Sequence, residues 1–145
     1  MKSFVNLVLL DSNFILLPFQ FKIDYFREIR QLLEGDLRFI IFQQILNELE
    51  SKKRREPNST NFSRWFYSGL LYLENNKNEY NIEIKEDIKD DNETTDDFLI
   101  KMSIRLKKKN HNLFLATNDS NLRKKAKKHN IRTIFLRQKK FLSLA

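Results

Sequence analysis

The sequence contains no cysteine, and it has only two residues each of glycine, proline and histidine. The absence of cysteine excludes disulfides, thiol nucleophiles and cysteine-based zinc sites, and it fits a reducing compartment. Neither Gly35 nor Gly69 follows an apolar run in a phosphate-binding pattern, which excludes a P-loop and a dinucleotide-binding fingerprint. His111 and His129 lie in basic, polar segments, so we expect both on the surface and neither as a catalytic base.

Long hydrophobic runs are also missing. No apolar segment approaches the roughly 20 residues that a membrane-spanning helix needs. The first apolar stretch is interrupted by Asn6 and ends at Asp11, so it lacks the long hydrophobic region and cleavage site of a signal peptide. These features predict a cytoplasmic protein without a membrane partner. The 145 residues, of which 41% are hydrophobic, are enough for one domain with a core and few for two.

Charge is distributed unevenly along a chain whose net charge is +8. From Lys101 to the C-terminus there are 14 Lys and Arg and one acid, Asp119, whereas residues 79–98 hold nine acids and two lysines. A basic segment of this kind is typical of a polyanion-binding surface, since each neutralised phosphate releases counterions. Solvated helix faces carry such charge too, so composition alone leaves nucleic-acid binding open.

Short apolar runs alternate with helical patterns along the whole chain. The helical segments show apolar residues on one face, and Asp24 and Gly35 are suited to begin and end the first of them. The expected strands are residues 4–10, 38–42, 80–84, 113–116 and 133–136, and the expected helices are 24–33, 43–54, 61–74, 96–108 and 120–128. We expect a break at 56–60, an acidic, flexible loop at 85–95 and a basic tail from about 137.

Strands that alternate with helices of this length predict an α/β fold with a mostly parallel central sheet and helices on both faces. Short apolar strands are expected when both faces of a sheet are covered. No repeat or linker divides the chain, so residues 1–145 are predicted to form a single domain.

Acidic residues follow several of these predicted strands. In open parallel sheets, ligands bind beyond the carboxyl ends of the strands. Asp11 directly follows the first strand, and Asp119 follows the fourth. Glu48 lies on the helix after the second strand, and Asp96 and Asp97 open the helix before the fourth. We therefore expect these carboxylates to converge at one rim of the sheet.

Each acid has a simpler explanation when taken alone. An Asp after a strand is commonly a turn residue or a helix cap, and Asp96 and Asp97 suit a cap and a first helical turn. Periodicity does not separate Glu48 from its solvated neighbour Glu50. Convergence favours a site, because carboxylates that repel one another are stabilised by a divalent cation, and oxygen-only ligation suits Mg²⁺ or Mn²⁺. Such a cation can activate water against a phosphodiester.

Four short motifs resemble the acidic motifs of PIN-domain nucleases, in the same order and spanning nearly the whole chain. They are residues 8–13 (VLLDSN), 47–50 (NELE), 96–100 (DDFLI) and 115–119 (LATND). Residues 14–21 and 136–140 resemble single-domain archaeal PIN proteins related to ribosomal-RNA processing nucleases. The resemblance implies a three-layer α/β/α sandwich and a Mg²⁺- or Mn²⁺-dependent endoribonuclease.

The resemblance also implies roles for individual residues. The catalytic, metal-binding positions match Asp11, Glu48, Asp97 and Asp119, and the supporting positions match Asn13, Asp96 and Thr117. The long acidic stretch before Asp96 departs from the family pattern and loosens the alignment of the third motif. From the basic charge we expect RNA to contact Arg123, Lys124, Lys127, Arg137, Lys139 and Lys140.

Several biological roles fit these expectations. The first is cleavage of ribosomal RNA or its precursor, with a ribosome-assembly protein as a partner. The second is a VapC-type toxin neutralised by an antitoxin, which a neighbouring antitoxin gene would indicate. The third is a non-catalytic RNA-binding module of ribosome assembly, in which Asp→Asn changes at the rim would leave function intact. The aromatic-rich helix at 61–74 is a candidate surface for a homodimer.

Overall fold

The computed structural model describes residues 5–56, 61–110 and 112–145, so the predictions for Phe4, for residues 57–60 and for His111 lie outside the described residues. Strands and helices alternate along the chain. They are β1 (Val5–Leu10), α1 (Ser12–Ile15), α2 (Leu17–Gln20), α3 (Tyr25–Leu32), β2 (Asp36–Phe42), α4 (Gln43–Arg55), α5 (Asn61–Asn76), β3 (Ile82–Lys85), α6 (Thr95–Lys109), β4 (Leu113–Ala116), α7 (Ser120–Lys128), β5 (Arg132–Arg137) and β6 (Phe141–Leu144).

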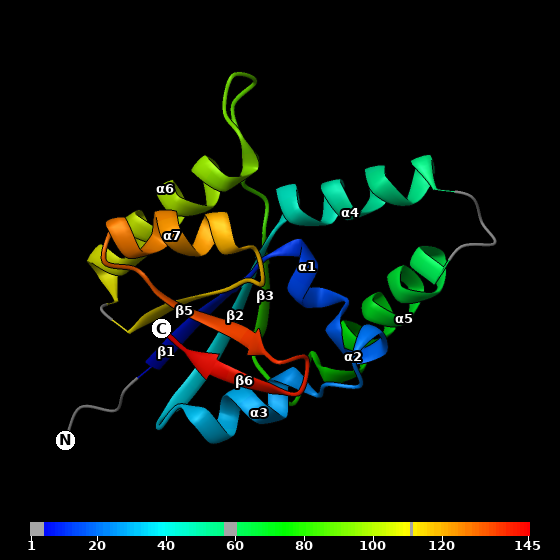
Figure 1. The fold of residues 1–145 in the computed structure, drawn as a ribbon. Coiled ribbons are helices and arrows are strands. Elements are labelled where there is room, and N and C mark those ends of the chain that lie inside the picture. Colours follow the sequence, from blue (N-terminus) through cyan, green and yellow to red (C-terminus); the bar gives the residue numbers. More distant parts are fainter. Residues whose placement is uncertain (1–4, 57–60, 111) are drawn as a thin grey trace.

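The strands form one sheet in the order β3-β2-β1-β4-β5-β6. All neighbouring strands are parallel except β5 and β6, which are antiparallel. Helices α6 and α7 lie on one face and α3 lies on the other (Figure 1), which confirms the predicted α/β/α arrangement. The chain leaves β1 toward β2 on one side and later returns to β4 on the other. Because the connections after β1 and β4 run in opposite directions, they leave room for a ligand at the carboxyl ends of these two strands.

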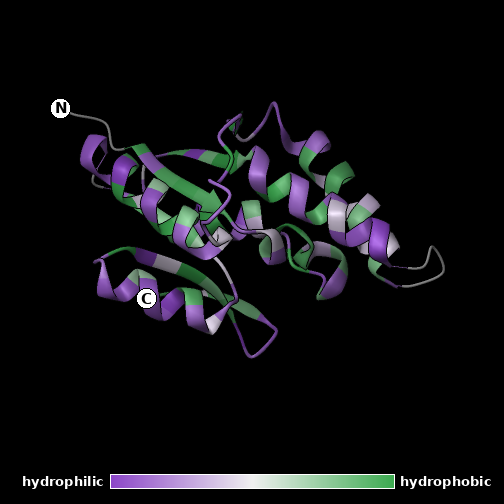
Figure 2. Ribbon diagram, turned by 90° about the horizontal axis from the view of Figure 1, so that it is seen from above, coloured by the Kyte–Doolittle hydropathy of each residue, from purple (hydrophilic) through white to green (hydrophobic). Residues whose placement is uncertain are grey.

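The apolar strands account for the core. Every residue of β4 is buried, and so are the last residues of β1 and β2. Figure 2 shows hydrophobic strands between helices whose outer faces are hydrophilic. An aromatic cluster joins α3, β2 and α5, with the ring of Phe26 4.6 Å from that of Phe39 and stacked on that of Tyr72. Among the described helices, none combines the length and apolarity needed to cross a membrane.

Apart from small shifts of helix and strand ends, three segments differ from the sequence prediction. Residues 12–20 form the short helices α1 and α2, because Asp11 caps α1 and Pro18 occupies the first turn of α2, where its missing N–H costs little. Residues 80–84 were expected to form a strand, but β3 begins only at Ile82. The expected basic tail instead turns at Gln138 and Lys139, both with positive φ, and pairs back onto β5 as strand β6.

Candidate functional site

Asp11 and Thr117 lie side by side because β1 and β4 are parallel neighbours whose last residues, Leu10 and Ala116, are in register. The Asp11 amide donates to the Ala116 carbonyl at 3.0 Å, which extends the ladder by one residue. The Thr117 hydroxyl then donates to Asp11 Oδ2 at 2.7 Å. Both side chains are buried. The sheet register therefore fixes the position of the Asp11 carboxylate.

Two asparagines complete the support of this carboxylate. The Asn13 side-chain amide donates to Asp11 Oδ2 at 3.3 Å, and Asn13 Oδ1 accepts from the backbone amide of Asn118 at 3.1 Å. Asn118 Oδ1 accepts from the Leu136 amide of β5 at 2.8 Å. The network thus links the loops after β1 and β4 to a third strand. Asn13 and Thr117, which the resemblance matched to supporting positions, are thus the two side chains that donate to Asp11.

The Asp11 carboxylate is strained electrostatically. Burial and the nearby charges of Asp96 and Glu48 raise its pKa to about 6, although the Thr117 hydroxyl and the Ser12 amide act in the opposite direction. The Ser12 amide donates to Asp11 Oδ1 at 2.8 Å, so the residue also caps α1, as the simpler reading of a post-strand aspartate predicts. Capping and a role in a site coexist here, because each carboxylate oxygen has two lone pairs.

Glu48 lies on α4, and its charge is among the causes of the raised pKa of Asp11, which do not include Glu50. The Thr95 hydroxyl donates a hydrogen bond to Glu48 Oε1, linking α4 to the start of α6. Glu50 is exposed and forms an ion pair with Arg54 at 3.2 Å. The structure thereby separates the two glutamates, which sequence periodicity left equivalent.

The structure brings Asp96 toward the other acids, and it turns Asp97 away. Thr94 caps α6 by accepting from the Asp97 amide, so both aspartates lie in the first turn on different sides of the helix. Burial and the charges of Asp119, Asp97 and Glu48 raise the pKa of Asp96, although the charge of Lys125 acts in the opposite direction. Asp97 is exposed, and a hydrogen bond from Lys125 at 3.3 Å lowers its pKa. Of the two, Asp96 is the one whose carboxylate is influenced by Asp119 and Glu48, although the resemblance matched Asp97 to the metal-binding position and Asp96 to a supporting one.

Asp119 stands at the start of α7. Its Oδ1 accepts from the amides of Asn121 and Leu122 at 2.8 and 3.2 Å, and its own amide donates to the Thr117 hydroxyl at 3.1 Å. No donor among the described residues contacts its Oδ2. One oxygen therefore fixes the side chain, while the other remains available to a ligand.

The acids form an open cluster. Within the described ranges, no three Asp, Glu, His or Cys side chains are arranged to hold a metal ion by themselves. The donor set nevertheless fits a hard cation, since all its donor atoms are oxygens. Burial makes the negative charge of Asp11 and Asp96 unfavourable, and a bound cation would offset it. Mg²⁺ in particular retains several waters and needs only one or two carboxylates as direct ligands.

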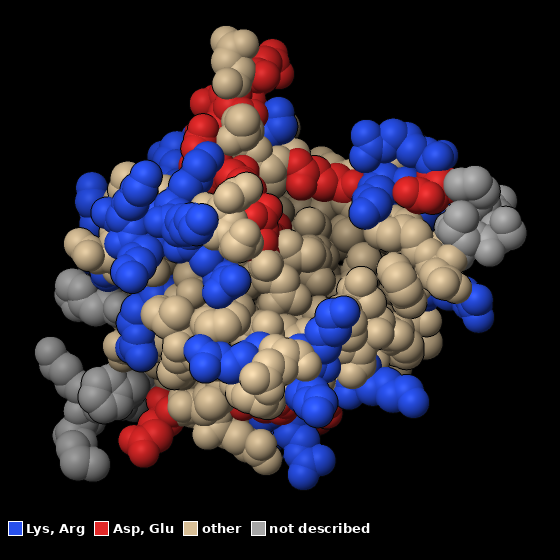
Figure 3. All heavy atoms as spheres, viewed as in Figure 1, with Lys and Arg blue, Asp and Glu red and all other residues tan. Residues whose placement is uncertain are grey.

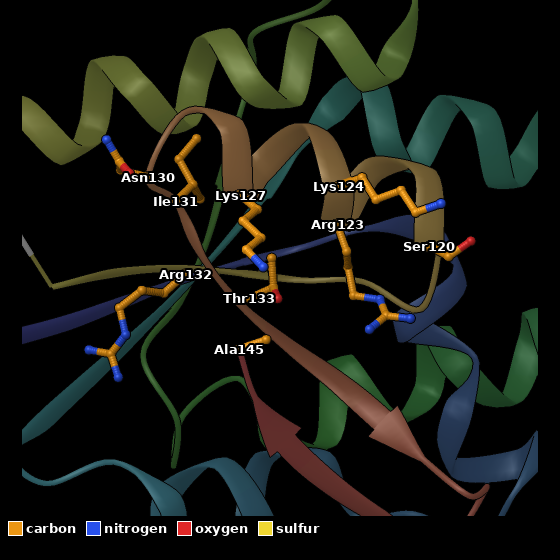
Figure 4. Close-up of a pocket in the computed structure, with 9 residues that line it drawn as sticks. All are labelled: Ser120, Arg123, Lys124, Lys127, Asn130, Ile131, Arg132, Thr133 and Ala145. Atoms are coloured by element: carbon orange, nitrogen blue, oxygen red, sulfur yellow. The ribbon is translucent and has the colours of Figure 1, made fainter.

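A basic groove begins one residue after Asp119. It has a volume of about 670 Å³ and lies between α7, β5 and the end of β6 (Figure 4). Its walls include Arg123, Lys124 and Lys127 of α7 together with Arg132 of β5. The guanidinium of Arg123 lies 4.2 Å from the centre of the Phe135 ring. Three of the residues expected to bind RNA therefore share one groove.

The other three expected RNA contacts lie beyond the groove at the end of β5. Arg137, Lys139 and Lys140 are exposed, and the Lys139 ammonium lies 6.0 Å from the centre of the Phe21 ring. Figure 3 shows acidic side chains in the middle of this face, with Lys and Arg gathered over α6 and α7 and again toward the far end of α4. The acids are thus bordered by positive charge.

Sequence reasoning missed three residues of the site. Thr95 supports Glu48, Asn118 ties the loop after β4 to β5, and Lys125 holds Asp97. Asn118 lies inside a motif that resembled the family, so its position was a usable signal. No sequence signal pointed to Thr95 or Lys125, because their contacts join segments far apart in the chain.

Comparison with known proteins agrees with this fold. The family model of the PIN domain matches residues 8–137. The structure is similar to that of the PIN domain endonuclease Utp24, with a TM-score of 0.70 and 20% identity over 95% of this chain and 90% of that one. It is also similar to a domain of a functionally unknown protein from Methanocaldococcus jannaschii DSM 2661, with a TM-score of 0.66 and 18% identity over 91% of both chains. No curated protein matches the sequence. Since the family model covers most of the chain, including all four acidic motifs, this chain belongs to the PIN domain family of nucleases.

Proposed function

We propose that this protein is an endoribonuclease that uses Mg²⁺ or Mn²⁺ to hydrolyse RNA phosphodiester bonds. The observation that carries the proposal is the electrostatic coupling of Asp11, Glu48, Asp96 and Asp119 at the carboxyl end of the sheet, beside a basic groove. Ribosomal RNA or its precursor is the first substrate to test, because the sequence motifs resemble archaeal PIN proteins of that type.

Asp11, Asp96 and Asp119 would hold the cation, directly or through water, and Glu48 would be a further ligand or would orient the attacking water. A bound divalent cation would supply an activated water and offset charge on the phosphodiester. Asp96 replaces Asp97 in this role because the Asp97 carboxylate is exposed and paired with Lys125.

The chain's own residues prepare the site for this chemistry. Thr117 and Asn13 donate to one oxygen of Asp11 and Ser12 donates to the other, so the carboxylate is fixed before any ligand arrives. Fixed donors and acceptors reduce the reorganisation needed during reaction. Thr95 holds Glu48 in the same way.

The basic groove would hold the RNA backbone. Helix α7 begins directly after Asp119 and carries Arg123, Lys124 and Lys127. Phosphates bound along this helix would therefore lead to the acids. Arg137, Lys139 and Lys140 would extend the same surface past the end of β5. The planar guanidinium of Arg123, which lies over the Phe135 ring, also offers a stacking surface for a base.

The test compares wild type with Asp11→Asn on single-stranded and structured RNA, in Mn²⁺, in Mg²⁺ and in EDTA. We expect wild type to cut RNA internally with metal, and we expect EDTA and the substitution to abolish cutting. Binding of RNA without cutting in every metal would instead favour a non-catalytic RNA-binding module. Equal cutting by wild type and Asp11→Asn would show that the cluster is not the active site.

A further inference from the structure

The far end of α4 carries four consecutive basic residues that the proposed RNA path along α7 does not use, Lys52, Lys53, Arg54 and Arg55. Positions i, i+4 and i+7 share one face of a helix, so Lys52 and Arg55 lie on the face of Glu48. These three line a surface hollow of about 410 Å³ together with Ser12, Leu49 and Ser51.

The other two basic residues of this turn, Lys53 and Arg54, do not line this hollow. Arg54 forms the ion pair with Glu50, and the Lys53 ammonium lies 5.1 Å from the centre of the Tyr67 ring. Arg55 is exposed, and among the described residues no side chain forms an ion pair or hydrogen bond with it. Lys52 is exposed as well, with its ammonium 4.7 Å from the centre of the Phe62 ring. What distinguishes Lys52 and Arg55 is therefore their position, since both are exposed and both line the hollow beside Glu48.

The helix dipole explains part of this pattern. Basic residues in a last turn stabilise a helix through the partial negative charge at its C-terminus. The dipole does not distinguish Lys52 and Arg55 from their neighbours, yet only these two line the hollow that Glu48 and Ser12 share. Ser12 follows Asp11 directly, so the hollow opens at the acid cluster. It adjoins α4, whereas the basic groove follows α7, and Figure 3 shows positive charge on both sides of the acids.

We propose that Lys52 and Arg55 form a second phosphate-binding position, so that an RNA chain is held on both sides of the scissile phosphate. One side of the chain follows α7, and the other follows α4 past Glu48. This inference rests on the proposed endoribonuclease function. An RNA held on both sides is positioned for internal cleavage and not for removal of a terminal nucleotide.

The test measures binding of a single-stranded RNA of about 12 nucleotides, within the range of site sizes for single-strand binders, in EDTA and over a salt series. Each phosphate contact on a single strand contributes about 0.7 to the slope of log K against log salt, so Lys52→Ala/Arg55→Ala should reduce the slope by about 1.4. The matched control is Lys53→Ala/Arg54→Ala, which removes the same charge from the same turn and should leave the slope near that of wild type.

A second variant shows whether the reduced slope comes from lost packing between α4 and α5, because Lys52 contacts Phe62. Arg55→Ala alone leaves that contact intact and should reduce the slope by about 0.7. An unchanged slope in the Lys52/Arg55 variants, an equal reduction in the control, or no RNA binding by wild type would each overturn the proposal. Cleavage is measured separately with Mn²⁺. Absence of cleavage together with the expected slopes would refute the nuclease function and leave the α4 position as an RNA-binding site.

Discussion

The two adjacent aspartates of the third acidic motif have opposite environments. The side chains of consecutive helical residues diverge by about 100° around the axis, so only one of the two can face the cluster. The cap at Thr94 sets this rotation, and it directs Asp96 inward and Asp97 toward Lys125. The resemblance matched Asp97 to a metal-binding position and Asp96 to a supporting one, whereas the surroundings of the two carboxylates favour the opposite order.

This geometry predicts different effects of Asp96→Asn and Asp97→Asn on RNA cleavage. Loss of an outer-shell partner of a metal typically costs about 10- to 100-fold, so Asp96→Asn should lower kcat/KM by at least this factor. Asp97→Asn should stay close to wild type, since exposed ion pairs contribute little. Initial rates at saturating Mn²⁺ measure the difference. The reverse order of effects would restore Asp97 to the site.

The raised pKa of Asp11 implies a conflict between stability and function, because the charged form that would bind a cation is the form that burial disfavours. Its pKa of about 6 lies above the ordinary 3.8, so the folded state favours the protonated form. Stability from this group is complete below about pH 4 and is lost as the pH rises through about 6, by roughly 3 kcal/mol for a shift of this size. Asp11→Asn should therefore raise Tm at pH 7.5 in EDTA and leave it unchanged near pH 4.

The Asn side chain can preserve two of the three hydrogen-bond contacts of the Asp11 carboxylate and loses the one from the Asn13 side-chain amide. Its oxygen can accept from Ser12, and its amide can donate to the Thr117 hydroxyl. Asp97→Asn is the control, because the pKa of Asp97 is lowered and its neutral replacement gains nothing at pH 7.5. A lower Tm for Asp11→Asn at pH 7.5 would contradict the assigned electrostatic strain.

Helix α5 packs against the segment that follows Asp11 through a glycine. A Cβ built on Gly69 would lie 3.0 Å from Leu16 Cδ2 and 3.2 Å from the Ile15 carbonyl oxygen. The backbones of α5 and α1 therefore approach closely at this point. The sequence alone gave no reason for this glycine, since glycine weakens an isolated helix.

We expect Gly69→Leu to destabilise the protein by at least the roughly 1–3 kcal/mol typical of an overpacked core. The side chain has no space to enter without displacing α1, whose first residue follows Asp11. Tyr67→Leu on the exposed side of α5 is the matched control and should change stability by less than about 0.5 kcal/mol. Urea unfolding midpoints measure both. A Gly69→Leu midpoint equal to that of wild type would show that the two helices can separate freely.

At the scale of the whole molecule, three exposed basic residues, Arg137, Lys139 and Lys140, stand where strand β5 ends and turns toward β6. Because β5 ends at Arg137, the turn at Gln138–Lys140 lies at the same end of the sheet as Asp11 and Asp119. The sequence suggested a basic tail from about residue 137. Pairing of β6 with β5 instead fixes the position of this charge relative to the acids.

Lys139→Ala/Lys140→Ala should weaken RNA binding and reduce the salt slope by about 1.4, if each lysine neutralises one phosphate. Arg38→Ala/Lys77→Ala removes the same charge from the opposite end of the sheet, where β2 and β3 begin, and should leave the slope unchanged. Fluorescence anisotropy over a salt series measures both variants. Equal slopes for the two doubles would mean that RNA binding depends on net charge and not on this surface.

The alternation of apolar runs with helical patterns was sufficient to predict the parallel sheet, because strands buried on both faces must be apolar along their whole length. It also placed Asp11 and Asp119 after their strands. Short elements such as α1, α2 and β6 were not predictable, since their few residues carry little periodicity and they are stabilised by contacts with distant segments. Only the tertiary structure gives Glu48 and Glu50, and likewise Asp96 and Asp97, different surroundings, and these surroundings favour one residue of each pair for the proposed site. Those choices depend on the rotation of each helix about its axis, which is set by packing and capping across the fold.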